Sequence, residues 1–326
     1  MEKKKIFICR KIAEKGLKML SENRAFEVEM NSEDRVLPKD ELIERARGCD
    51  ALVTLLTDKI SADVIEDLGP NLKIIANYAV GFDNIDVNAA KAKNIVVTNT
   101  PEVMTQAVAE HAMALMLCCA RRIVEGDQYV RDKKYKRWEP ELLLGPEIAG
   151  KTLGIVGIGR IGTALAQIAY HGFGMKILYH DINRNEEIER TLQADYASLN
   201  HLLEESDFVS LHVPLLPSTK HMLSHEQFRI MKKNAILVNT ARGPIVDEHA
   251  LAEALEEKKI FAAGIDVFEF EPNPVPKLLE LDNIVFTPHI ASATHEAREA
   301  MSECVAENII EVLHGRPAKT PVHPVK

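Results

Sequence analysis

The stretch KTLGIVGIGRIGTALAQIA, residues 151–169, decides the fold of this chain. It begins with an apolar run typical of a buried strand, continues with the pattern Gly-x-Gly-x-x-Gly, and ends in small and apolar residues typical of a helix. Gly157 permits a tight turn, Gly159 lets backbone amides approach a pyrophosphate, and Gly162 lets the helix pack on the strand. The predicted cofactor contacts of this loop are therefore Gly157, Gly159, Arg160, Ile161 and Gly162.

An acidic residue follows the next strand. The apolar run Lys176–His180 ends in Asp181, about 20 residues after the glycine motif, where dinucleotide-binding folds place a carboxylate. A carboxylate there hydrogen-bonds the ribose hydroxyls of the adenosine and repels a 2′-phosphate. The sequence thus predicts NAD as the cofactor in preference to NADP.

Apolar strands and amphipathic helices alternate along almost the whole chain, which indicates parallel sheets covered on both faces. Two long helical stretches, 102–122 and 294–314, each follow a short segment that contains proline. We place domain boundaries there. Residues 101–288 are predicted to form a NAD-binding Rossmann domain. Residues 1–100 with 289–326 are predicted to form a discontinuous substrate-binding domain, so that the fold is α/β with two Rossmann- or flavodoxin-like parallel-sheet domains.

Composition excludes several classes of function. The chain has 326 residues and a formal net charge of −9 at pH 7, so it has no global basic field for nucleic acid. No apolar run approaches the roughly 20 residues of a membrane span. The five cysteines are odd in number and form no Cys-x-x-Cys pair. This pattern favours a protein of the reducing cytoplasm, and it gives no support for disulfides or for a metal site.

Three polar side chains lie just after buried strands, at the edge where open α/β sheets bind ligands. Arg242 follows one apolar run, Glu271 lies in the acidic stretch after the next, and His289 follows the last. An arginine can bind a carboxylate, and a histidine beside an acid can transfer a proton. We expect the three to converge beside the dinucleotide.

Four blocks of sequence carry a family resemblance, namely GIGRIG (157–162), NTARGPIVDE (239–248), GIDVFEFEP (264–272) and TPHIASAT (287–294). The chain resembles the D-isomer-specific 2-hydroxyacid dehydrogenase family along essentially its whole length. Three further blocks, LVTLLTDK (52–59), NYAVGFDNID (77–86) and RWEP (137–140), resemble its glyoxylate/hydroxypyruvate reductase branch. Several reductases of that branch use NADP and lack an acid at the position of Asp181, which supports NAD here.

The resemblance implies the role of each residue. Arg242 binds the substrate carboxylate and polarises the keto oxygen, His289 donates the proton, and Glu271 orients the imidazole and favours its charged form. Asp266 lies near the nicotinamide, and Thr240 is a further cofactor contact. In the other domain, the backbone amides of Val80 and Gly81 bind the carboxylate. Trp138 reaches the pocket of a partner subunit, and the pairing in a homodimer involves residues 102–122. His111 in that stretch is expected to pack in a core or a subunit interface.

The expected activity is NAD(H)-dependent reduction of a small 2-keto acid, such as glyoxylate or hydroxypyruvate, to the D-2-hydroxy acid, and the reverse. A 3-phosphoglycerate dehydrogenase or another D-2-hydroxyacid dehydrogenase stays open as an alternative. Val80 argues against a phosphite dehydrogenase, which has a lysine there, and Glu271 argues against a formate dehydrogenase, which has a glutamine. A NAD-sensing protein that resembles transcriptional corepressors is the alternative of another class.

Overall fold

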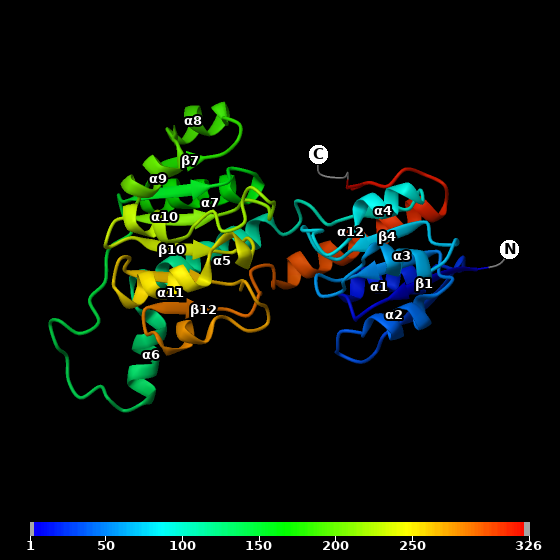
Figure 1. The fold of residues 1–326 in the computed structure, drawn as a ribbon, viewed down its shortest axis with the longest axis horizontal. Helices are drawn as coiled ribbons and strands as arrows, with labels where there is room; N and C mark the ends of the chain where they lie inside the picture. Colours follow the sequence, from blue (N-terminus) through cyan, green and yellow to red (C-terminus); the bar gives the residue numbers. More distant parts are fainter. Residues whose placement is uncertain (1–2, 323–326) are drawn as a thin grey trace. The chain divides into compact units, whose positions relative to one another are not determined.

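The computed structural model describes residues 3–322, which form two compact units. Unit 1 runs to Met104 and resumes at Ala293, and unit 2 is Thr105–Ser292. The expected boundaries lay after residues 100 and 288. Each unit is built on a parallel sheet with helices around it (Figure 1), which confirms the predicted α/β fold class.

The sheet of unit 1 has five strands in the order β2-β1-β3-β4-β5, all parallel. This is the strand order of flavodoxin-like folds. The strands are β1 (Lys4–Ile8), β2 (Phe26–Met30), β3 (Ala51–Thr54), β4 (Ile74–Asn77) and β5 (Val96–Thr98). The helices are α1 (Glu14–Ser21), α2 (Lys39–Ala46), α3 (Ala62–Asp67), α4 (Val87–Ala92) and, from the end of the chain, α12 (His295–Leu313).

The late helix α12 completes the core of unit 1. Ile6 and Ile8 of β1 are buried in one cluster with Val305 and Ile309 of α12, while Phe7 points to the other face. Side chains alternate in this way because successive residues of a strand face opposite sides of the sheet. Figure 1 shows α12, in orange and red, beside the blue strands of this unit.

The helices α1 and α12 approach each other closely at a glycine. The Gly16 amide donates to the Ser302 hydroxyl at 3.0 Å, and a Cβ atom on Gly16 would lie 2.0 Å from the Ser302 carbonyl oxygen. Any side chain at position 16 would therefore separate the two helices.

The sheet of unit 2 has seven parallel strands in the order β12-β11-β10-β9-β6-β7-β8. The order runs outward from β6 in both directions, so the carboxyl ends of β6 and β9 flank the switch point where such sheets bind ligands. The strands are β6 (Thr152–Val156), β7 (Lys176–His180), β8 (Asp195–Tyr196), β9 (Phe208–Leu211), β10 (Ile236–Asn239), β11 (Ala262–Ile265) and β12 (Ile284–Phe286). The α-helices are α5 (Thr105–Ala120), α6 (Ile123–Arg131), α7 (Arg160–Phe173), α8 (Glu186–Leu192), α9 (Leu199–Glu205), α10 (His225–Ile230) and α11 (Glu248–Glu256), and the 3₁₀ helices are η1 (Gly243–Ile245) and η2 (Pro276–Glu280).

Two apolar clusters cover the two faces of this sheet. Leu237 belongs to the cluster that includes side chains of α9, α10 and α11, while its neighbours Ile236 and Val238 belong to the cluster with α5 and α7. The predicted helices 102–122 and 294–314 are observed as α5 and α12, with slightly later starts and earlier ends. Although α5 is long and apolar, none of the helices within residues 3–322 combines the length and hydropathy that crossing a membrane requires.

Candidate active site

The glycine loop between β6 and α7 has two positions that admit only glycine. Gly157 has φ +96°, and a Cβ atom there would lie 2.7 Å from the backbone of His212. A Cβ atom on Gly162 would lie 2.2 Å from the Gly157 carbonyl oxygen. At Gly159 a Cβ atom would meet no atom of the described residues within 4 Å, so the start of α7 faces open space. This is the shape that a pyrophosphate needs at a helix N-terminus.

Asp181 lies beside this loop. Its carboxylate accepts a hydrogen bond from the Ile158 amide at 2.7 Å, which joins the end of β7 to the glycine loop. A cavity of about 470 Å³ lies here. We call it the ribose pocket, and its lining residues are Ile158, Gly159, Asp181, Asn183, Arg184, Asn185 and Glu186.

His212, at the end of β9, lies on the other side of Gly157. Its Nε2 atom is 2.8 Å from the Ser210 hydroxyl, and its backbone amide donates to the Val156 carbonyl oxygen at 2.7 Å. Burial lowers the pKa of His212 to about 4. His212 is therefore neutral at pH 7 and supports the turn next to the glycine loop.

The loop after β10 presents Arg242. The Asn239 side chain shapes this loop, because it accepts from the Ala241 amide at 3.1 Å and donates to the Arg242 carbonyl oxygen at 3.0 Å. The guanidinium donates from Nη1 to the Ala241 carbonyl oxygen at 2.7 Å. At Gly243 a Cβ atom would lie 1.9 Å from the Phe268 carbonyl group, so this loop packs directly on the loop that carries Glu271.

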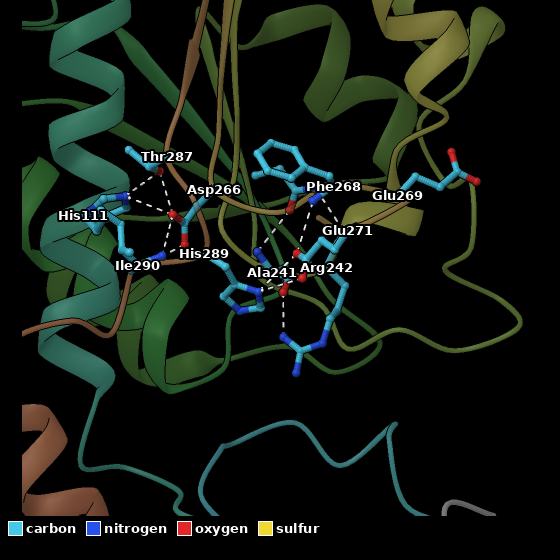
Figure 2. A network of polar contacts seen from close by, with 12 residues as sticks. His111, Ala241, Arg242, Asp266, Phe268, Glu269, Glu271, Thr287, His289 and Ile290 are labelled. Atoms are coloured by element: carbon cyan, nitrogen blue, oxygen red, sulfur yellow. Dashed lines mark hydrogen bonds and ion pairs between the residues drawn. The ribbon is translucent and has the colours of Figure 1, made fainter. Parts of the chain in front are cut away.

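Glu271 and His289 form a pair. The Nδ1 atom of His289 lies 3.1 Å from each carboxylate oxygen of Glu271, and the side chains of His289 and Glu271 stay partly exposed, at 31% and 40% respectively. His289 has φ +55°, an uncommon conformation for a residue with a side chain. Figure 2 shows the side chains of Arg242, Glu271 and His289 converging from three different loops. Glu271 therefore engages the Nδ1 side of the imidazole and fixes its orientation.

A buried carboxylate holds the backbone around His289. Asp266, fully buried, accepts from the amides of Ile290 and Ala291 at 2.8 Å each and from the Thr287 hydroxyl at 2.6 Å. The Nε2 atom of His111 on α5 lies 2.9 Å from the Thr287 hydroxyl and 3.5 Å from Asp266 (Figure 2).

These contacts keep Asp266 charged. Burial by itself raises the pKa of Asp266, but the hydrogen bonds from His111, Thr287 and the two amides outweigh it, so that the pKa lies below its usual value. The two amides that follow His289 are therefore tied to a carboxylate, which fixes the backbone of the histidine.

A second buried carboxylate clamps the loop that carries Glu271. Glu248, the first residue of α11, accepts from the Glu269 amide at 2.5 Å and from the Val275 amide at 2.7 Å. These two amides lie near the two ends of the loop 268–275. Glu269 itself points away from Glu271 (Figure 2) and contacts His221, with Oε1 to Nε2 at 2.6 Å.

Sequence reasoning missed two of these residues. His111 was expected to pack in a core or an interface, but the structure places it in the hydrogen-bond network of Asp266. Glu248 stands at the start of a helix, where an acid is ordinarily a surface residue that complements the helix dipole. No local sequence pattern indicates that the Glu248 side chain turns inward. The pattern that comes closest to such a signal is the Asp-Glu pair at 247–248 before an apolar helix.

Other predicted residues lie elsewhere in the fold. Val80 and Gly81 belong to unit 1, in the loop after β4, where the side chains of Asn99 and Asn77 donate to their carbonyl oxygens at 2.7 and 2.8 Å. Trp138 follows α6 in unit 2 and is 77% exposed. Within residues 3–322, no cluster of three or more His, Cys, Asp or Glu side chains is arranged to hold a metal ion.

The sheet of unit 2 is of the dinucleotide-binding type, and a histidine–carboxylate pair and an arginine lie at its strand ends. This combination is typical of an oxidoreductase. The comparisons with known proteins make this specific. The family model described as D-isomer specific 2-hydroxyacid dehydrogenase, NAD binding domain, matches residues 113–291. The chain belongs to the D-isomer-specific 2-hydroxyacid dehydrogenase family, as the resemblance predicted.

Relatives span the whole chain. A glyoxylate reductase of Korarchaeum cryptofilum is 52% identical over 96% of this chain and 94% of its own. The crystal structure of TT0316 protein from Thermus thermophilus is 45% identical, with a TM-score of 0.92 over 98% of this chain and 100% of the other. An NADPH-dependent glyoxylate/hydroxypyruvate reductase from Sinorhizobium meliloti is 34% identical, with a TM-score of 0.86 over 98% of both chains. The chain is thus similar to glyoxylate reductases, at least one of which uses NADPH.

Proposed function

We propose that this protein reduces glyoxylate, hydroxypyruvate and similar small 2-keto acids with NADH, and oxidises the corresponding D-2-hydroxy acids with NAD. The observation that carries the proposal is the Glu271–His289 pair, at 3.1 Å, on strand-end loops of the same sheet as Arg242 and the glycine loop. The similarity to glyoxylate reductases supports the choice of substrate.

The residues of unit 2 fit a dinucleotide. The start of α7 faces open space at Gly159, and the ribose pocket adjoins it. The buried hydroxyl of Thr240 has no hydrogen-bond partner among the described residues, which suits a contact with a bound cofactor. When bound, a nicotinamide cofactor supplies the hydride. Asp181 supports NAD over NADP, because a carboxylate repels a 2′-phosphate.

The protein side chains supply binding and the proton. Arg242 binds the substrate carboxylate and polarises the keto oxygen with its forked guanidinium. Protonated His289 donates a proton from Nε2 to that oxygen in reduction, and neutral His289 accepts a proton at Nε2 from the hydroxyl in oxidation. Glu271, at Nδ1, keeps the imidazole oriented. Asp266 and Glu248 hold the two loops that carry this pair.

The family resemblance supports three further hypotheses. We infer that the backbone amides of Val80 and Gly81 bind the substrate carboxylate and that the protein is a cytoplasmic homodimer in which Trp138 reaches the partner's pocket. All five cysteines are free, which suits a reducing compartment.

The test is an assay of NADH and NADPH oxidation with a panel of 2-keto acids. We expect turnover with glyoxylate and hydroxypyruvate and a higher kcat/KM with NADH than with NADPH. Equal or better kcat/KM with NADPH would overturn the cofactor assignment. A protein that binds NADH tightly but turns over none of the panel would be a dinucleotide sensor and would contradict the enzymatic proposal.

A further inference from the structure

The ribose pocket contains a cation that a 2′-phosphate could use. Among its lining residues Arg184 carries the positive charge, and it lies three positions after Asp181 in the same turn. Arginine is the residue that most often recognises phosphate, because its planar fork matches two oxygens. Asp181 alone would therefore not account for the proposed preference for NAD over NADP.

Arg184 is already bound in a forked pair. Its Nε atom donates to Oε1 of Glu189 at 3.0 Å and its Nη2 atom donates to Oε2 at 2.7 Å. The guanidinium also lies 5.7 Å from the ring centre of Tyr196. The Nε–Nη2 edge of the guanidinium, one of the forks that could bind a phosphate, is thus engaged with a carboxylate.

Glu189 is itself anchored to the core. It is 21% exposed where Arg184 is 63% exposed, and its Oε1 atom accepts from the Tyr179 hydroxyl at 2.5 Å. Tyr179 lies on β7 with its ring fully buried, and the Asn185 amide donates to its hydroxyl at 2.8 Å. The carboxylate is therefore held by a buried side chain, and Arg184 is the more exposed member of the pair.

We propose that Glu189 is a second determinant of cofactor choice, which withholds the Arg184 guanidinium from the 2′-phosphate of NADP. Asp181 repels the phosphate, and Glu189 both repels it and occupies the cation that would bind it. The inference rests on the proposed binding of a dinucleotide in this pocket. It adds to the role of Asp181 a residue eight positions later, on α8, which the glycine motif does not identify.

Glu189→Gln is the decisive substitution. The glutamine oxygen can still accept from the Tyr179 hydroxyl, so the anchor is kept. Its NH₂ group then faces a donor of Arg184, and two donors cannot bond each other. Arg184 loses its Nη2 bond and its ion pair with the carboxylate, and becomes available to a phosphate.

Calorimetric dissociation constants for NADP⁺ and NAD⁺, and for the fragments 2′,5′-ADP and 5′-AMP, test this without turnover. Glu189→Gln should tighten NADP⁺ and 2′,5′-ADP by about fivefold, the value of a charge-assisted contact at a partly exposed site, and leave NAD⁺ and 5′-AMP nearly unchanged. The double variant with Asp181→Ala should gain more than either single variant. Adding Arg184→Ala should abolish the gain that Glu189→Gln brings. Glu187→Gln, on the exposed side of α8, is the charge-matched control and should change none of the constants.

Two results would overturn the role of Glu189. One is an unchanged or weaker NADP⁺ affinity in Glu189→Gln while NAD⁺ binds normally. The other is a gain that persists after Arg184→Ala or that appears equally in Glu187→Gln, since the cause would then be general charge. A wild-type protein that binds neither dinucleotide would overturn the proposed function together with this inference.

Discussion

At the scale of single residues, His289 is the side chain whose removal should lower kcat most. Removing a positioned general acid lowers the rate by on the order of 10²–10⁴-fold. We expect His289→Ala to lose this much in kcat for glyoxylate reduction, while the dissociation constant for NADH stays near its wild-type value because the glycine loop is untouched. The exposed His249→Ala is the matched control. A His289→Ala variant that reduces glyoxylate at close to the wild-type rate would exclude the mechanism.

Glu271→Gln separates the pair from the histidine alone. The amide keeps the size of the side chain but removes the carboxylate that holds the imidazole at Nδ1. We expect a lower kcat for glyoxylate reduction, because the imidazole is then less well oriented toward the substrate oxygen. The measurement is kcat with glyoxylate, with a solvent isotope effect to establish that proton transfer limits the rate. An unchanged kcat under that condition would exclude the pair.

His212 should make stability depend on pH. Its pKa is lowered from 6.5 to about 4, so between these values the unfolded chain binds a proton that the folded chain does not. The contribution of His212 is complete above pH 6.5 and is lost as the pH falls toward 4, by at most about 1.4 kcal/mol per pH unit. The free energy of unfolding, measured with urea at pH 7, 6 and 5, should depend less on pH in His212→Asn than in the wild type. The exposed His201→Asn should leave it unchanged, and equal slopes in all three proteins would count against the prediction.

At the scale of elements, the loop 268–275 depends on the first turn of α11. Glu248→Gln replaces one of two acceptor oxygens by a donor that faces an amide. A lost bond of this kind costs about 1–3 kcal/mol, so the melting temperature should fall. Because the loop carries Glu271, kcat should fall as well, while the KM for NADH stays constant.

The control for this variant is Glu253→Gln on the same helix, where the carboxylate is largely exposed and ion-paired with His225. A lower melting temperature with an unchanged kcat would assign Glu248 a role in stability alone.

The sequence predicted regular elements better than the shapes of loops. The strand Lys176–His180 and the helices now labelled α5 and α12 could be recognised because their hydrophobic periodicity is local. The glycine loop could be recognised because its motif requires a specific backbone. The contacts of Asp266 with His111 and of Glu248 with Val275 could not be predicted, since each joins residues far apart in the chain and depends on how whole elements pack.

At the scale of the whole molecule, the exposed apolar side chains of unit 2 suggest a subunit interface. Pairing was expected to involve residues 102–122, but much of α5 is buried against its own sheet. Large apolar side chains are exposed just after it, and α6 with the following segment stands away from the sheet in Figure 1. These side chains are Ile123, Val124, Val130, Tyr135, Trp138 and Leu144.

We predict a two-fold homodimer through this segment, since such a surface is unusual on a monomer. Sedimentation at micromolar concentration should give twice the chain mass, and Val124→Asp with Val130→Asp should shift it toward the monomer. A wild-type monomer would refute the dimer.

Trp138→Ala should change KM or kcat for larger keto acids, and unchanged constants across the panel would refute its place in the partner's pocket.

The discontinuous unit 1 has a consequence for the order in which the protein folds during synthesis. Five strands leave the ribosome first, but α12, which covers one face of their sheet together with α1, is made last, after all of unit 2. Until α12 emerges, the face formed by Ile6, Ile8, Val53 and Ile74 lacks the apolar side chains of α12 that pack on it in the complete protein. Unit 2 is complete in sequence before that moment. The part of the protein that is translated first is therefore the part that finishes folding last, and its nascent sheet is the surface on which a chaperone would act.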